Sequence, residues 1–256
     1  MESQKPKIAM YVKRPFGEKL NASFDFLKEN WKLLLKFTTY LLLPLCLIQA
    51  LSLNGLMSGA LSISAIASST AMAASSSSLI AFGSYYGLYM FLYLIGIILL
   101  TSLVYGLIRT YNEREERLQG VTLGMLKPRL FRNIKRLLLM TGACMLLVLF
   151  VGIFVGLLVA LTPFTLFLTI PFIIAFSVPL ALLAPIYLFE DITLMEAFKK
   201  TFRLGFATWG GVFLILIVMG IIASVLQGIV SIPWYVIYIV KMIFTMSDGG
   251  ATSSSV

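Results

Sequence analysis

Residues 137–188 read LLLMTGACMLLVLFVGIFVGLLVALTPFTLFLTIPFIIAFSVPLALLAPIYL and contain no charged side chain. A helix needs about 20 apolar residues to cross the roughly 30 Å of hydrocarbon in a lipid bilayer. This stretch is therefore long enough for two crossings, and the dipeptide Thr162-Pro163 near its middle fits a tight turn. We predict a transmembrane hairpin with spans at 137–161 and 164–188.

Three further stretches are apolar enough to cross a membrane, at 33–53, 85–108 and 210–230. Of the 256 residues, 59% are hydrophobic and 12% are charged, with a mean hydropathy of +0.96, whereas a soluble domain has about 25% charged residues. Backbone in lipid must satisfy its own hydrogen bonds, which favours helices, and the alternating pattern of a membrane β-barrel is absent. We predict an all-α, polytopic transmembrane helix bundle, with a cytoplasmic segment at 1–32 and a single transmembrane domain at 33–256.

The net charge of +9 is concentrated in three blocks, at 1–36, 109–136 and 190–203. Only Lys241 and Asp248 lie elsewhere. Charges avoid the apolar stretches because a charge at the centre of a span costs about 2.5–3.5 kcal/mol, so the basic composition does not indicate nucleic acid. Alternating spans put all three blocks on one side, and the positive-inside rule makes that side cytoplasmic. We predict a multi-pass protein of a bacterial inner (cytoplasmic) cell membrane with a cytoplasmic N-terminus.

The remaining segments are predicted on the outer side. Residues 54–84 form a loop rich in Ser and Ala, either a flexible linker or a small-residue helix on the bundle. Residues 231–246 would reach only about 24 Å as a helix, so we expect a short interfacial or re-entrant segment held by Trp234, Tyr235 and Tyr238. Residues 247–256 are expected to be a loop, with the sequence truncated before a sixth span. The tyrosines near 85–93 are expected to form an outer interfacial belt.

Each odd-numbered span follows a basic amphipathic segment, which predicts helices lying in the membrane interface. The first carries an apolar stripe at three- and four-residue steps, as does the last; the middle one is interrupted by Pro128. Thr193 and Glu196 fit a capping box at the start of the last segment. A shift of 178 residues superimposes Trp31 on Trp209, which is either a weak internal repeat or the common pattern of juxtamembrane helices. The stripes comprise Phe16, Leu20, Phe24, Leu27 and Trp31; Leu123, Leu126, Leu130, Ile134 and Leu137; and Leu194, Phe198, Phe202, Phe206 and Trp209.

Residues 185–204 read PIYLFEDITLMEAFKKTFRL and are followed by Trp209. This run resembles bacterial multi-pass inner-membrane proteins related to the membrane domain of glycerophosphoryl diester phosphodiesterases and to uncharacterised stand-alone relatives of that domain. The resemblance covers 185–209, and only the topology agrees elsewhere. It implies a six-span membrane domain without known chemistry, because catalysis in the two-domain enzymes belongs to a separate soluble domain.

The chain lacks the side chains that most catalytic sites require. It has no histidine, and its predicted spans contain no Asp or Glu, so zinc motifs and Ser-His relays are excluded. Cys46 and Cys144 are expected to pack as small apolar residues. We predict no catalytic residue, no cofactor and no metal. Glu113, Glu115 and Glu116 fit a solvated run, and Glu190 and Asp191 either cap helices or lock the cytoplasmic face by pairing with neighbouring cations.

Three sets of candidate functional residues remain. Basic side chains expected to contact anionic lipid headgroups are Arg129, Arg132, Lys135, Arg136, Lys199, Lys200 and Arg203. Prolines expected to kink the fourth span are Pro171, Pro179 and Pro185. Small residues expected in helix packing, internal or between two copies, are Gly83, Gly87, Gly152, Gly156, Gly220 and Ser224.

These patterns favour a non-enzymatic membrane protein that acts as a scaffold or binds lipid or a partner protein. Its expected partners are membrane lipids with anionic headgroups, and a homo- or hetero-oligomer is left open. The alternative is a transporter or channel-like component for a neutral or lipidic substrate, since broken helices mark many transporter sites.

Overall fold

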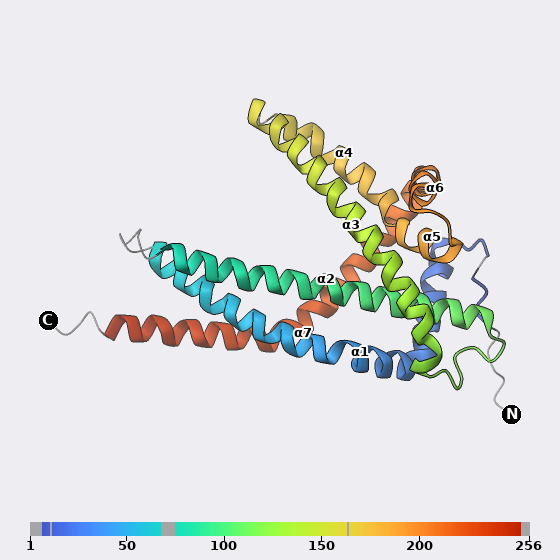
Figure 1. The fold of residues 1–256 in the computed structure, drawn as a ribbon, viewed down its shortest axis with the longest axis horizontal. Helices are drawn as coiled ribbons and strands as arrows, with labels where there is room; N and C mark the ends of the chain where they lie inside the picture. Colours follow the sequence, from blue (N-terminus) through green and yellow to red (C-terminus); the bar gives the residue numbers. More distant parts are fainter. Residues whose placement is uncertain (1–6, 11, 68–74, 163, 252–256) are drawn as a thin grey trace.

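The computed structural model describes residues 7–10, 12–67, 75–162 and 164–251, and these residues are almost entirely helical (Figure 1). No strand occurs in these ranges. The helices are α1 (Phe16–Ala67), α2 (Ser75–Glu113), α3 (Leu123–Leu161), α4 (Thr165–Leu180), α5 (Leu183–Glu190), α6 (Leu194–Ala207) and α7 (Trp209–Ala251).

Within the described residues, five helical segments are long and apolar enough to cross a membrane. They are α1, α2, α3, the α4–α5 pair and α7, and each contains one predicted span. The prediction of an all-α polytopic bundle is confirmed. Most of the large apolar side chains on these helices are exposed, as expected for a protein whose solvent is lipid.

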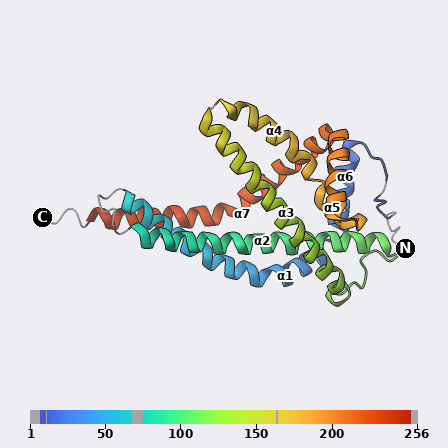
Figure 2. The same ribbon diagram turned by 45° about the horizontal axis from the view of Figure 1, so that its top comes forward.

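α1 and α2 form an antiparallel hairpin whose helices approach closely (Figures 1 and 2). The approach depends on glycine, because a Cβ on Gly55 would lie 2.6 Å from the Tyr85 ring and one on Gly59 would lie 3.3 Å from Phe82. Both helices extend beyond their predicted spans. The described parts of the predicted loop 54–84 are therefore helical continuations of the hairpin, rather than a linker or a separate helix on the bundle.

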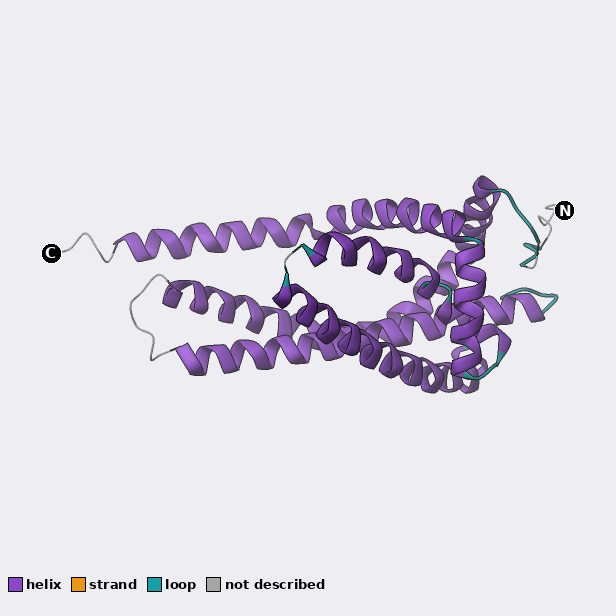
Figure 3. Cartoon of the chain, turned by 90° about the horizontal axis from the view of Figure 1, so that it is seen from above, coloured by secondary structure: helices purple, strands orange, loops and turns teal. Residues whose placement is uncertain are grey.

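α3 and α4 form a second hairpin that diverges from the first (Figures 1 and 2). The two hairpins meet at one end of the molecule, beside α5 and α6. There, Leu103 and Leu107 of α2 are fully buried against Phe37 of α1 and Leu126 of α3. α7 packs on α4 and α6, and its C-terminal part lies apart from the α1–α2 hairpin when seen from above (Figure 3).

Two predictions about helix boundaries are wrong. Residues 231–246 are not a separate interfacial or re-entrant segment, because α7 runs without interruption through Pro233 to Ala251. The predicted loop 247–256 is helical up to Ala251, and residues 252–256 lie outside the described part. A helix inside an apolar run has no water to take over its hydrogen bonds, so one proline does not end it.

The amphipathic segments also differ from the prediction. Those before the first and third spans are the first turns of α1 and α3 themselves, and Pro128 lies inside α3. Only α6 is a separate amphipathic helix. It ends where Thr208 donates from its hydroxyl and its amide to the Leu204 carbonyl. Ser23 is exposed whereas the residue predicted to correspond to it, Thr201, is fully buried, so the structure gives no support to the internal repeat.

Candidate functional site

The three charged blocks lie together at the end where the two hairpins meet (Figure 1). Glu29 of α1 joins the first block to the second, since it accepts from Arg117 at 2.7 Å and from the Tyr111 hydroxyl at 3.1 Å. Asp191 joins the second block to the third through Arg109. The clustering predicted from the topology is therefore present in the folded chain.

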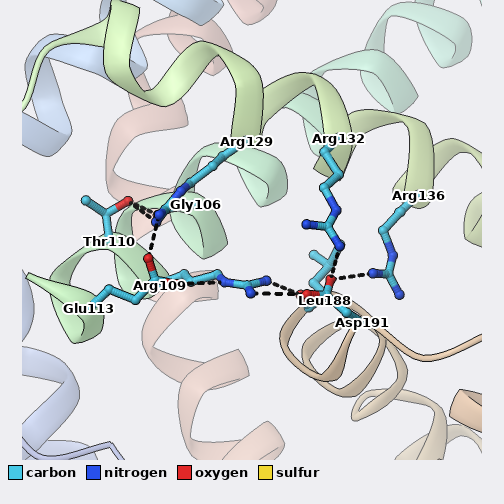
Figure 4. Close-up of polar contacts among 9 residues, drawn as sticks. All are labelled: Gly106, Arg109, Thr110, Glu113, Arg129, Arg132, Arg136, Leu188 and Asp191. Carbon is cyan, nitrogen blue, oxygen red and sulfur yellow. Dashed lines mark hydrogen bonds and ion pairs between the residues drawn. The ribbon is translucent and has the colours of Figure 1, made fainter.

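Most of the ion pairs at this end belong to an arginine cluster formed by α2, α3 and the residue after α5 (Figure 4). Its six charged members are Arg109, Glu113, Arg129, Arg132, Arg136 and Asp191. The helical period explains how they meet. Arg109 and Glu113 are four residues apart on α2, and the three α3 arginines are spaced by three and four, so each set lies on one helix face.

Asp191 is the hub of the arginine cluster. Its carboxylate accepts from Arg109 at 3.1 Å and from Arg136 at 2.6 Å, and it lies 2.9 Å from the Arg132 guanidinium. Asp191 ends α5 in the left-handed region, with φ 54°, a conformation that Asp and Asn tolerate better than most residues. This conformation places the carboxylate on the C-terminal side of α5, facing α3.

The ionisation of Asp191 is controlled by two opposing effects. Partial burial raises the pKa of its carboxyl group, while the hydrogen bond from Arg109 and the charges of Arg109, Arg132 and Arg136 lower it. The arginines outweigh burial, so the pKa lies below its ordinary value. Asp191 is therefore a carboxylate at any pH near neutrality.

Glu113 is the second acid of the arginine cluster. It accepts from Arg109 Nε at 3.0 Å and from Arg129 Nη2. Arg129 also donates to the Thr110 hydroxyl at 3.0 Å, and that hydroxyl donates to the Gly106 carbonyl at 2.8 Å. Glu113 is exposed, as predicted for a solvated run, but α2 and α3 each bring an arginine to its carboxylate.

The arginines differ in how firmly they are held. Arg136 donates to the Ile192 carbonyl at 2.7 Å, lies 4.2 Å from the Tyr187 ring centre, and has a side chain only 15% exposed. Arg132 contacts Asp191 through Nη2 and is 59% exposed. Arg136 thus holds α3 to α5, whereas the guanidinium of Arg132 has N–H groups left for another ligand.

A cavity of about 130 Å³ lies within the arginine cluster. It is lined by Gly106, Arg109, Glu113, Arg129, Arg132 and Asn133. The whole cluster holds four arginines and two carboxylates, so positive charge is in excess. Guanidinium groups pair with carboxylate and phosphate in a bidentate geometry, and the cavity is therefore chemically suited to an anion.

The predicted lipid-contact residues fall into two groups. Arg129, Arg132 and Arg136 form internal ion pairs, as does Lys200 with Glu190 at 2.6 Å. Asp191 pairs with cations of the neighbouring block, as the locking alternative predicts, and it also caps α5. Glu190 pairs only with Lys200, which belongs to its own block. Lys135, Lys199 and Arg203 are exposed and form no ion pair with any described residue. They are the exposed members of the set that no described carboxylate holds in an ion pair, so they can contact lipid headgroups at the surface.

The predicted break in the fourth span occurs at Ala181-Leu182, between α4 and α5. Pro185 lacks the amide that would bond the Ala181 carbonyl, and Pro179 likewise leaves the Ala175 carbonyl free. Trp209 satisfies the Ala175 carbonyl by donating from Nε1 at 3.0 Å. The third proline, Pro171, lies inside α4 without ending the helix.

The break is also packed tightly against α6. A Cβ on Gly205 would lie 2.5 Å from Pro179 Cβ and 2.6 Å from its Cα. Gly205 follows Ala197 and Thr201 at intervals of four, and all three are buried. The capping box of Thr193 and Glu196 is present at the start of α6, as predicted.

The predicted small-residue motifs are not where the helices of one chain approach closely. All six residues are exposed: Gly83, Gly87, Gly152, Gly156, Gly220 and Ser224. No atom lies within 4 Å of a Cβ built on any of the five glycines. The prediction that these residues pack helices within one chain is therefore wrong, and their contact between two copies stays a prediction. Spacing alone does not say which face of a helix meets a neighbour.

Sequence reasoning missed the central role of Arg109 and the Glu29 link to Tyr111 and Arg117. One signal for Arg109 was available, since it is the first charge after the second uncharged span and lies four residues before Glu113. Within the described residues, no three Cys, Asp or Glu side chains are grouped as metal ligands would be.

Known proteins give no guide to this arrangement: no protein-family model, no curated protein and no solved structure matches the chain.

Proposed function

We propose that the chain is a non-enzymatic scaffold of a bacterial inner membrane, with its N-terminus and arginine-rich end in the cytoplasm. In this role the arginine-rich end binds anionic lipid headgroups and fixes the position and orientation of the helices in the bilayer. Partner proteins would then contact the apolar faces that the single chain leaves exposed.

The observation that carries the proposal is the position of the uncompensated cations. Lys135, Lys199 and Arg203 are exposed at the same end as the arginine cluster, whereas the described spans beyond it present apolar side chains. A Lys or Arg near an anionic membrane surface contributes about 1 kcal/mol to association. Three such cations support an attraction of about 3 kcal/mol, before any contribution from the cluster itself.

A transporter for a neutral or lipidic substrate is the alternative, and the break between α4 and α5 favours it. Discontinuous helices form binding sites when their freed backbone groups face a cavity. Of the two carbonyls that prolines free at the break, that of Ala175 is already satisfied by Trp209, and Gly205 packs against Pro179. The break therefore supports a structural role more than a transport site.

Lipid retention tests the proposal directly. The variant K135E/K199E/R203E reverses three exposed cations and leaves every ion pair of Asp191 and Glu113 intact. Native mass spectrometry of the full chain should show loss of most bound phosphatidylglycerol, while K135R/K199R/R203K, which keeps the charges, should retain it. Unchanged retention in the reversed variant would refute the proposal.

The orientation is tested by cysteine labelling in intact cells. In a background without Cys46 and Cys144, single cysteines replace Glu18, Thr70 and Glu115. An impermeant maleimide should label the variant at 70 and leave those at 18 and 115 unlabelled until the cells are opened. Labelling of 18 and 115 from opposite sides would contradict the topology.

A further inference from the structure

We propose that the cavity in the arginine cluster is a binding site for a phosphate monoester group. The inference rests on the proposed engagement of anionic headgroups and narrows it to one cavity and one chemical class. The chemistry is shared by a lipid with a monoester headgroup, such as phosphatidic acid, and by soluble monoesters such as glycerol 3-phosphate.

The arrangement of donors is the first observation. Arg129, Arg132 and Asn133 lie on one face of α3 at intervals of three and four, and they line the cavity opposite Arg109 of α2. A guanidinium offers five N–H groups in a planar fork that matches phosphate oxygens. Arg132 contacts Asp191 through Nη2 alone, and each terminal nitrogen of Arg109 and Arg129 carries a second N–H besides the one it donates within the chain. Donors from three arginines suit the three terminal oxygens of a monoester, whereas a phosphodiester has only two non-bridging oxygens.

Charge is the second observation. Glu113 and Asp191 neutralise two of the four arginines in the cluster (Figure 4), so two positive charges remain. A phosphate monoester carries about −1.5 to −2 charges at pH 7, which balances that excess. A diester headgroup would leave about half of the excess uncompensated.

The size and depth of the cavity are consistent with this ligand. A single water molecule needs a cavity of about 10–15 Å³. The cavity of about 130 Å³ therefore accommodates a phosphoryl group and several waters. Gly106 lies near the end of the predicted span 85–108, and Arg109 is the first charge after it. The cavity therefore lies at the level where the second span leaves the apolar layer, which is where lipid phosphates lie.

Gly106 provides a variant that narrows the cavity without removing any charge. A Cβ on Gly106 would meet only Asn133 Nδ2, at 3.8 Å, which is an ordinary van der Waals distance. Alanine is also a better helix former than glycine, so G106A is expected to fold. The matched control is G142A on α3, where nothing lies within 4 Å of the added methyl group.

A second variant tests the guanidinium fork. R132K keeps a positive charge near Asp191, but lysine cannot bind two phosphate oxygens in a planar fork. G106A and R132K should each weaken binding of phosphatidic acid by about tenfold, equivalent to about 1.4 kcal/mol. G142A should bind as the original chain does.

The experiment measures lipid binding to the full chain in detergent by native mass spectrometry, with phosphatidic acid and phosphatidylglycerol of the same acyl composition. The original chain should prefer phosphatidic acid, and G106A should lose that preference while keeping its phosphatidylglycerol. Competition with glycerol 3-phosphate identifies the source: displacement of phosphatidic acid at micromolar concentrations assigns the site to soluble monoesters, and resistance assigns it to the lipid.

Two results would overturn the inference: equal binding of the two lipids by the original chain, or equal behaviour of G106A and G142A. Either result leaves the proposed function standing if K135E/K199E/R203E still loses phosphatidylglycerol. Conversely, if that triple variant retains all anionic lipid, the proposed function is refuted. The binding of phosphatidic acid by G106A, R132K and G142A then still decides whether the cavity binds a monoester.

Discussion

The substitution D191N removes the negative charge at the centre of the arginine cluster and leaves the shape of the side chain nearly unchanged. Three guanidinium groups, from Arg109, Arg132 and Arg136, then converge on a neutral amide. Asparagine tolerates the left-handed backbone of this position as aspartate does, so the substitution tests the charge and not the turn.

The expected cost follows from the contacts. Asp191 accepts two charge-assisted hydrogen bonds, and such bonds contribute about 1.5–3 kcal/mol each. Its side chain is 30% exposed, which places the contribution at the lower end, and the asparagine oxygen keeps one weaker bond. We expect D191N to lower the free energy of unfolding by about 2 kcal/mol, or the apparent Tm by about 4–8 °C.

The assay is thermal unfolding of the full chain in one detergent, followed by tryptophan fluorescence at a fixed scan rate, because membrane-protein unfolding is often irreversible. The control is D25N on α1, where the aspartate is exposed and forms no ion pair with any described residue. R132Q added to D191N should restore part of the lost stability, since it removes one uncompensated charge. An apparent Tm of D191N equal to that of D25N would refute the account of Asp191 as the hub.

Three further predictions concern the same end of the molecule. W209F removes the indole donor to the Ala175 carbonyl and should cost about 1 kcal/mol, measured as a lower apparent Tm; no change would show that water satisfies the carbonyl equally well. G205A places a methyl group against Pro179 and should cost about 1–3 kcal/mol, whereas alanine at an open glycine of α3 should cost nothing. Because the folded pKa of Asp191 is lowered, its stabilisation is complete above the unfolded value of about 3.9 and declines as the pH falls through the lower folded value. The Tm difference between the original chain and D191N should therefore be constant near neutral pH and shrink as the pH falls below about 3.9; a difference that stays constant or grows in acid would contradict this.

The positions of the spans could be predicted because they depend mainly on one free-energy cost, that of placing a charge in hydrocarbon. Charges are expensive in hydrocarbon, so the uncharged runs give the five membrane-crossing segments. The ends of the helices were harder to predict, since rules for aqueous helices treat Pro233 and the amphipathic starts of α1 and α3 as boundaries. In an apolar run the backbone has no alternative partner, and the helix continues through such positions.

The candidate site was only partly predictable. The charge distribution predicts that the three blocks share one end, but not which side chains pair. Asp191 becomes the hub because α5 ends there in a left-handed turn, and Arg109 reaches it from α2 although 82 residues separate the two. Pairings over such separations depend on how α2, α3 and α5 pack together, and the local pattern of the sequence does not contain that information.

Charge balance links this geometry to the proposed role. Arg109 and Arg136 are held in place by carbonyls, a tyrosine ring and Asp191, so their positive charges stay at the end of the spans in every packing that keeps α5 attached to α3. Uncompensated charges near hydrocarbon are costly, and the two acids of the cluster leave an excess of two. An anion from outside the chain would lower that cost, and lipid phosphates are the most abundant anions at that depth. On the proposed binding of phosphate, the anion adds to the ion pairs that Glu113 and Asp191 already supply, so removing the lipid should lower the apparent Tm of the chain.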